Sequence, residues 1–70
     1  MIKLIYTKTY YNIDGIKCVV QEESYVNPRY VMTIEDAPDG KTKITLKDGS
    51  VFRDDRDASI ISDLVTKWLI

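Results

Sequence analysis

The hydrophobic spacing changes once along the chain, and this change limits the fold more than any other feature. Between residues 2 and 52, apolar side chains mostly alternate with polar ones, which is typical of half-buried β-strands. Near the end of the chain, the spacing becomes that of one face of a helix. The residues on this stripe are Ile60, Ile61, Leu64, Val65, Trp68 and Leu69. We therefore expect several strands followed by one amphipathic helix.

Turn-forming residues divide the strand region into short segments. Clusters of Asn, Asp, Gly and Pro lie at residues 12–15, 27–28, 36–41 and 48–49. The predicted strands between them are residues 2–11, 16–23, 29–36, 42–47 and 50–53. Short connections join antiparallel neighbours, so the prediction is an α+β fold. It is an antiparallel β-meander of four to five strands with one C-terminal amphipathic helix packed on one face, all within a single small domain, residues 1–70.

The composition argues against catalysis. The sequence has no histidine, the commonest general base and metal ligand. Its single cysteine, Cys18, predicts a core position and no disulfide, and a lone thiol suits a reducing, cytoplasmic location. The formal net charge of −1 gives no overall attraction to nucleic acid or to an anionic membrane. We expect no enzymatic activity, no cofactor and no membrane association.

One helix can cover only one face of such a sheet. The more continuous apolar set is assigned to the face beneath the helix: Leu4, Tyr6, Cys18, Val20, Met32, Ile34, Ile44 and Leu46. The opposite face is richer in Thr and Lys, as solvated antiparallel faces usually are. Its residues are Lys3, Ile5, Thr7, Thr9, Lys17, Val19, Gln21, Val31, Thr33, Lys43, Thr45 and Lys47. The reverse assignment stays open and would leave Tyr6 and Tyr30 exposed.

An apolar strip on the second face is the candidate protein interface. Exposed apolar strips often mark binding surfaces, and a mixed-charge corner where the sheet meets the helix is a reasonable docking point. The strip and the corner comprise Ile5, Val19, Val31, Phe52, Arg53 and Arg56. Because so short a chain buries little surface, we also expect a homo-oligomer.

The same face allows an alternative function. Sheets that bind single-stranded nucleic acid stack bases on aromatic rings and meet phosphates with lysines. The candidate contacts are Lys3, Tyr11, Lys17, Lys43 and Lys47, with Tyr25 as a further aromatic residue. The balanced overall charge argues against this alternative.

The densest charge lies at residues 53–57, directly before the helical pattern. The two arginines there would hold the three aspartates ionised, and the spacing fits no calcium loop, which leaves magnesium on one or two carboxylates as the remaining metal hypothesis. The preferred interpretation is a helix start. Asp54 or Asp55 would be the N-cap and Asp57 would lie in the first turn, where negative charge is favourable. This role does not account for Arg53 and Arg56.

Together these patterns favour a small non-enzymatic interaction module that binds a protein partner as a homo-oligomer. Very short, histidine-free chains with tyrosine and lysine look like products of phages and bacterial mobile elements, many of which bind and modulate a host macromolecule. An open sheet also leaves edge backbone groups with which another chain can pair. The alternative is a single-stranded nucleic-acid-binding regulator that uses the Lys/Thr/Tyr sheet face.

Overall fold

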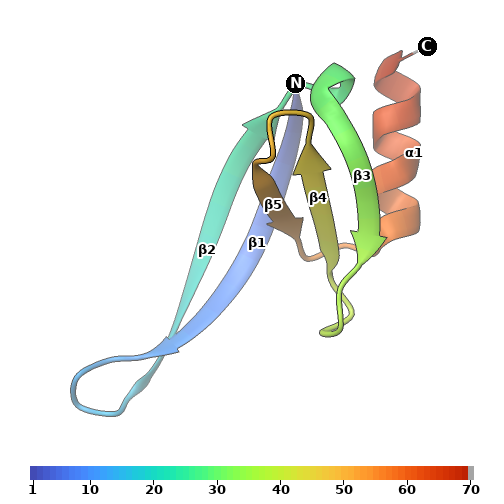
Figure 1. The fold of residues 1–70 in the computed structure, drawn as a ribbon. Helices are drawn as coiled ribbons and strands as arrows, with labels where there is room; N and C mark the ends of the chain where they lie inside the picture. Colours follow the sequence, from blue (N-terminus) through green and yellow to red (C-terminus); the bar gives the residue numbers. More distant parts are fainter. Residues whose placement is uncertain (70) are drawn as a thin grey trace.

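The computed structural model describes residues 1–69 and confirms the α+β fold with antiparallel strands and a C-terminal helix (Figure 1). The strands form two sheets, one of two strands in the order β1-β2 and one of three in the order β3-β4-β5. In chain order the elements are β1 (Ile2–Tyr11), β2 (Lys17–Val26), the 3-10 helix η1 (Pro28–Tyr30), β3 (Val31–Asp36), β4 (Thr42–Leu46), β5 (Val51–Asp54) and α1 (Ala58–Leu69).

The meander is interrupted between β2 and β3, which do not pair. β2 continues to Val26, beyond the predicted end at residue 23, because Val26 lies opposite Ile2 and both side chains are buried. The chain then turns through η1, where the Asn27 side chain accepts a hydrogen bond from the Arg29 amide at 3.0 Å and Pro28 is buried. This turn starts the second sheet instead of adding a strand to the first.

The core lies between the base of the β1-β2 hairpin, the three-stranded sheet and α1. Its buried members are Ile2, Leu4, Val26, Ile44, Ile61 and Val65. The predicted inner face is therefore correct for Leu4 and Ile44. It is wrong for Val20, which is exposed, and for Cys18, which lies far out on the hairpin and is partly buried there.

The strict alternation predicted for the third strand fails at its start. The register between β3 and β4 shifts between Val31 and Thr33, which indicates a bulge or irregularity. Such an irregularity changes which side chains face inward. Val31 and Ile34 both pack against the core, whereas Met32, predicted to be inside, is 58% exposed.

Helix α1 buries a narrower stripe than the sequence predicts. It packs against β3, β4 and η1, with Ile61 and Val65 buried and Leu64 partly so. Ile60 and Leu69 are exposed, and Trp68 is 57% exposed, so the prediction that the whole apolar stripe packs on the sheet is wrong for these three residues. At 12 residues, α1 is well short of the roughly 20 apolar residues that a membrane-crossing helix needs, and it is the sole α-helix in residues 1–69.

The helix contact can be tested with two truncations. Ile61→Ala should lower the free energy of unfolding by about 2–5 kcal/mol, because it leaves a cavity in the core. Trp68→Ala should cost less than about 1.5 kcal/mol, because more than half of the side chain is already in water. Urea titrations followed by circular dichroism measure both, and equal losses for the two variants would contradict this packing.

Candidate interaction surface

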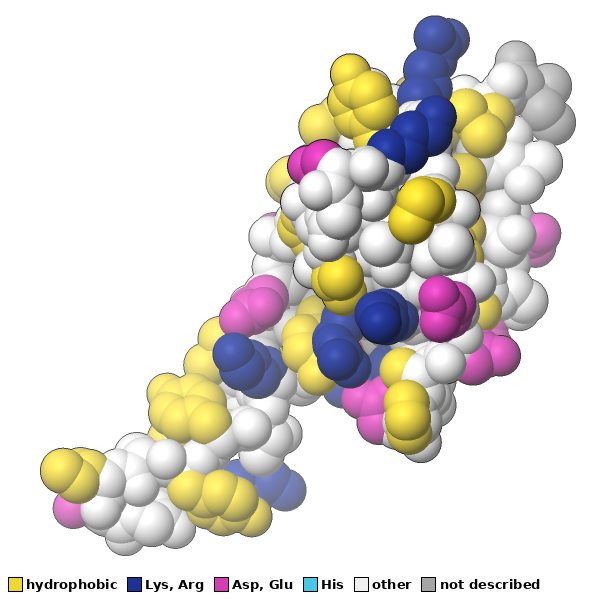
Figure 2. All heavy atoms as spheres, in the orientation of Figure 1, with side chains coloured by type: hydrophobic (Ala, Val, Ile, Leu, Met, Phe, Trp, Pro, Cys, Tyr) yellow, Lys and Arg dark blue, Asp and Glu magenta, His cyan; other side chains and the backbone are white. Residues whose placement is uncertain are grey.

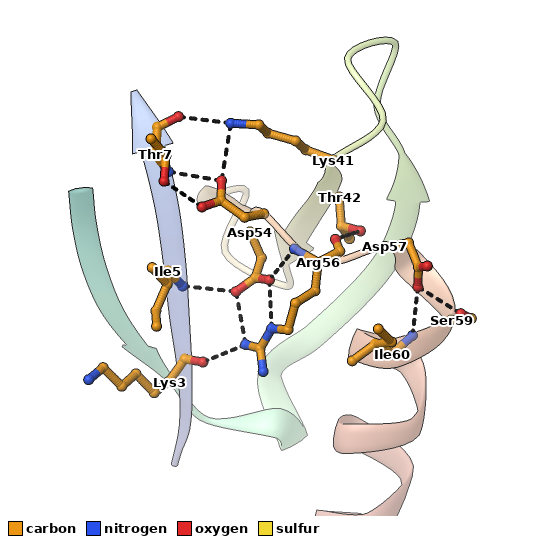
Figure 3. Close-up of polar contacts among 11 residues, drawn as sticks. Lys3, Ile5, Thr7, Lys41, Thr42, Asp54, Arg56, Asp57, Ser59 and Ile60 are labelled. Atoms are coloured by element: carbon orange, nitrogen blue, oxygen red, sulfur yellow. Dashed lines mark hydrogen bonds and ion pairs between the residues drawn. The ribbon is translucent and has the colours of Figure 1, made fainter. Parts of the chain in front are cut away.

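The outer edge of β1 is capped by side chains from residues 41–56, and this contact joins the two sheets (Figure 3). Every capping hydrogen bond reaches an odd-numbered residue of β1, and the backbone groups of these residues point away from β2. We refer to the capping residues Lys41, Asp54, Asp55 and Arg56 as the edge cluster.

Asp54 is the buried member of the edge cluster, with no exposed surface. Its Oδ2 accepts a hydrogen bond from the Ile5 amide at 2.8 Å. Arg56 donates from Nε to Oδ1 at 2.8 Å and from Nη2 to Oδ2 at 2.9 Å, a two-pronged pairing that fixes both side chains. The same Nη2 donates to the Lys3 carbonyl at 2.9 Å. Asp54 thus acts on β1 directly and through Arg56.

Asp55 and Lys41 continue the cap along β1. The Asp55 amide donates to the Ile5 carbonyl at 2.8 Å, and its carboxylate accepts from the Thr7 amide at 2.9 Å and the Thr7 hydroxyl at 2.6 Å. Lys41 Nζ donates to the Thr7 carbonyl at 2.9 Å, pairs with Asp55 Oδ1 at 3.1 Å and lies 4.8 Å from the centroid of the Tyr6 ring. Backbone groups of Lys3, Ile5 and Thr7 are thereby satisfied without a paired strand on this side of β1.

The electrostatics of the edge cluster favour ionised carboxylates. Burial alone would raise the pKa of Asp54, but hydrogen bonds from Arg56 and the Ile5 amide outweigh it and leave the pKa below its ordinary value. Hydrogen bonds from the Thr7 hydroxyl and amide, with Lys41 nearby, lower the pKa of Asp55. The Arg56 pKa is raised by its hydrogen bonds to Asp54.

The N-cap of α1 lies later in the chain than the predicted position at Asp54 or Asp55. The aspartate that caps α1 is Asp57, whose Oδ1 accepts from the Ile60 amide at 3.2 Å and from the Ser59 hydroxyl at 2.7 Å. These bonds lower the Asp57 pKa. Asp54 and Asp55 are not helix caps, because their oxygens are turned toward β1. The pairing with Asp54 is the role of Arg56, which the sequence did not explain.

The described residues hold no cluster of acidic side chains that resembles a metal site. Residues 1–69 contain no group of three or more Asp, Glu or Cys side chains that could hold a metal ion. A groove of about 640 Å³ lies between the hairpin and β5, lined by Tyr6, Lys8, Glu22, Ser24, Val51, Phe52 and Arg53. Glu22 is its sole carboxylate and has Lys8 as an ion-pair partner at 3.8 Å, so the groove lacks the two acids that paired-carboxylate chemistry needs.

The distal part of the hairpin projects from the body as an arm, residues 8–20 (Figure 1). The molecule measures 48 × 21 × 18 Å, and its radius of gyration of 13.5 Å exceeds the roughly 11 Å expected for a compact chain of this length. Figure 2 shows hydrophobic side chains along the arm and at its tip. The exposed apolar and aromatic residues of the arm are Tyr10, Tyr11, Ile13, Ile16, Val19 and Val20.

The tip of the arm is held by one side chain. Asn12 Oδ1 accepts hydrogen bonds from the amides of Asp14 at 3.0 Å and Ile16 at 2.9 Å. The Gly15 amide donates to the Asn12 carbonyl at 2.9 Å, and Gly15 takes the positive φ of 75° that this turn requires. This network fixes the turn that carries Ile13, whose side chain is fully exposed.

The outer edge of β2 lacks the protection that β1 has. Because the odd-numbered residues of β1 point their backbone groups outward, the even-numbered pairs carry the ladder bonds of the hairpin. The odd-numbered residues of β2 therefore also point outward, and within residues 1–69 β2 pairs with β1 alone. These residues are Lys17, Val19, Gln21, Glu23 and Tyr25.

The predicted interface residues do not form one strip. Val31 and Phe52 pack against the core, and Ile5 is partly buried. Val19 is exposed on the arm, Arg53 is exposed on β5 and Arg56 belongs to the edge cluster. Several exposed apolar side chains lie on the arm instead, and others lie on η1, β3, β5 and α1. The sequence signal for the arm is Ile13, an apolar residue that lies in the turn and outside both predicted strands.

The predicted nucleic-acid contacts lie on separate elements. Tyr11 and Lys17 face each other where the arm ends, Lys43 is partly buried on β4, and Lys47 is exposed after β4. Lys3 forms an ion pair with Glu23 at 3.4 Å. The additional aromatic candidate, Tyr25, is exposed on β2 opposite Lys3.

Comparisons with protein-family models, with curated proteins and with solved structures found no significant match to this chain. The function must therefore be inferred from the residues described above.

The edge cluster makes a sharp prediction about stability. Asp54→Ala should lower the free energy of unfolding by about 3 kcal/mol, because it leaves the Ile5 amide and Arg56 without their acceptor. Arg53→Ala, which changes an exposed neighbour on β5, should cost less than about 0.5 kcal/mol. Chemical denaturation of both variants measures the difference. A small loss of unfolding free energy for Asp54→Ala would show that the edge cluster does not stabilise the fold.

The same cluster predicts acid sensitivity. Since the pKa values of Asp54 and Asp55 are lowered in the folded state, their contribution is complete above the ordinary value of 3.8 and is lost as the pH falls below it. Thermal unfolding between pH 7 and pH 2 should show a falling midpoint below about pH 4. In Asp54→Asn this decline should be shallower, and an unchanged slope would contradict the assignment.

Proposed function

We propose that this protein is a non-enzymatic interaction module that binds a protein partner through the arm and works as a homo-oligomer. The observation that carries the proposal is the projection of apolar side chains on an ordered hairpin that the rest of the described chain does not cover. Exposed apolar clusters of this kind mark binding surfaces. A reducing location such as the cytoplasm suits the free thiol of Cys18.

Two physical arguments support binding by the arm: it loses little conformational entropy on binding, and covering it stabilises the hairpin. A two-stranded hairpin without a packed face is marginally stable in water, so a surface that covers it stabilises both partners. The turn at Asn12 already orders the tip, which reduces the entropy lost on binding. Aromatic residues such as Tyr10 and Tyr11 are enriched among residues that dominate binding energy.

Binding of single-stranded nucleic acid is the alternative. Its support is local: Tyr11 and Lys17 lie opposite each other near the tip of the arm, which places an aromatic ring and a positive charge at one site. The net charge of −1 does not favour it.

Site-specific crosslinking tests the proposal in cells that produce the protein. A photoreactive amino acid in place of Ile13 should give one dominant protein adduct, whereas the same group in place of Ser62, exposed on α1, should not. With the purified adduct partner, Ile13→Asp should weaken binding about 30-fold and Ser62→Asp should not.

Two outcomes decide against it. Equal crosslinking from positions 13 and 62 would mean that the arm is not a binding element. An adduct to nucleic acid from position 13, lost as salt is raised, would support the alternative.

A further inference from the structure

We infer that the partner of the β2 edge is β2 of a second copy, paired antiparallel about a two-fold axis at Val20. This inference rests on the proposed homo-oligomer and specifies its interface. The outward-pointing backbone groups lie on odd-numbered residues of β2, so an antiparallel neighbour must match odd residues with odd residues. A two-fold axis then passes between the two copies of one residue, which lie opposite each other.

The charges on β2 select the position of that axis. With Val20 on the axis, Lys17 of each copy faces Glu23 of the other, Val19 faces Gln21, and Cys18 faces Glu22. Opposite charges directly across an antiparallel pair are favourable. Moving the axis to Gln21 pairs Lys17 with Tyr25, and moving it to Val19 pairs Lys17 with Gln21. The register centred on Val20 is therefore the one that pairs Lys17 with an acid.

Registers with the axis further along β2 are opposed by repulsion. An axis at Glu22 sets Glu22 against its own copy, and an axis at Glu23 does the same for Glu23. Like charges directly opposite each other destabilise strand pairing. Charged residues on an edge strand usually deter pairing. Here they oppose the registers centred on Glu22 and Glu23 and favour the one centred on Val20, because Lys17 lies six positions from Glu23 with Val20 midway between them.

The pairing also supplies what the arm lacks. It converts two separate two-stranded hairpins into one four-stranded sheet, β1-β2-β2-β1, and three or more strands are far more stable than a lone pair. The antiparallel direction lays each arm along the base of the other hairpin. Ile16 then lies opposite Ser24 of the second copy, so the exposed arm of each copy runs beside ordered backbone. The outer edges of the new sheet are the two β1 strands, which the edge cluster already caps at Lys3, Ile5 and Thr7.

Charge reversal with rescue tests the register. Sedimentation equilibrium of the full chain should show a dimer. Lys17→Glu and Glu23→Lys should each raise the dissociation constant of the dimer about tenfold or more, because the two-fold axis makes each substitution affect two charge pairs. The double variant, Lys17→Glu with Glu23→Lys, should restore the wild-type value. Circular dichroism confirms that each variant is folded.

A disulfide test locates the axis. In a Cys18→Ser background, Val20→Cys should form a disulfide-linked dimer under mild oxidation, because two residues of a non-hydrogen-bonded pair lie about 4.5 Å apart between Cα atoms. Gln21→Cys is the matched control. It should crosslink poorly, because its two copies would lie about 7–8 Å apart on a diagonal.

Each result bears on the inference. A monomer at all concentrations, or a dimer that is insensitive to both reversals and is not trapped by Val20→Cys, would overturn it. Stronger trapping by Gln21→Cys would overturn the register. An adduct from position 13 to a protein other than a second copy does not depend on this dimer, so failure of this interface and failure of partner binding by the arm are separable.

Discussion

The contact of Asp54 with the edge of β1 holds together two sheets that share no strand pairing. A carboxylate buried without exposed surface is tolerated because the Ile5 amide and the two-pronged Arg56 surround it. The base of the hairpin also joins the hydrophobic core that contains Ile44 and Ile61, so a polar contact and an apolar one connect the same two sheets. In a chain of 70 residues, which can bury little apolar surface, such a contact has unusual weight.

Capping β1 with side chains has a consequence for the rest of the surface. A strand edge can be hidden by another strand, by a helix or by charged groups, and here Lys41, Asp55 and Arg56 take the last route. The opposite edge of the same hairpin, on β2, has no such cover among the described residues. The hairpin therefore has one edge that is capped at Lys3, Ile5 and Thr7 and one edge that is not capped among the described residues.

Much of the fold was predictable from local patterns, and most errors arose where distant residues meet. The limits of β1, the turn at Gly15 and the final helix follow from period and turn chemistry, which depend on neighbouring residues. The inward position of Val31 depends on the shift in register against β4, which alternation in one strand does not encode. The role of Asp54 depends on Ile5, 49 positions earlier in the chain. A run of aspartates before a helix looks like a cap from sequence, and which of them caps was decided by tertiary contacts.

The edge cluster also fixes the order in which the chain can become protected. β1 is made before the residues that cap its edge, three of which lie at positions 54–56, at the end of β5 and directly after it. Until those residues leave the ribosome, the hairpin carries two open edges instead of one, and unpaired edges are where growing chains associate wrongly. Residues 54–56 thus cover the β1 edge at Lys3, Ile5 and Thr7, and among the described residues they leave β2 as the uncapped edge of the hairpin.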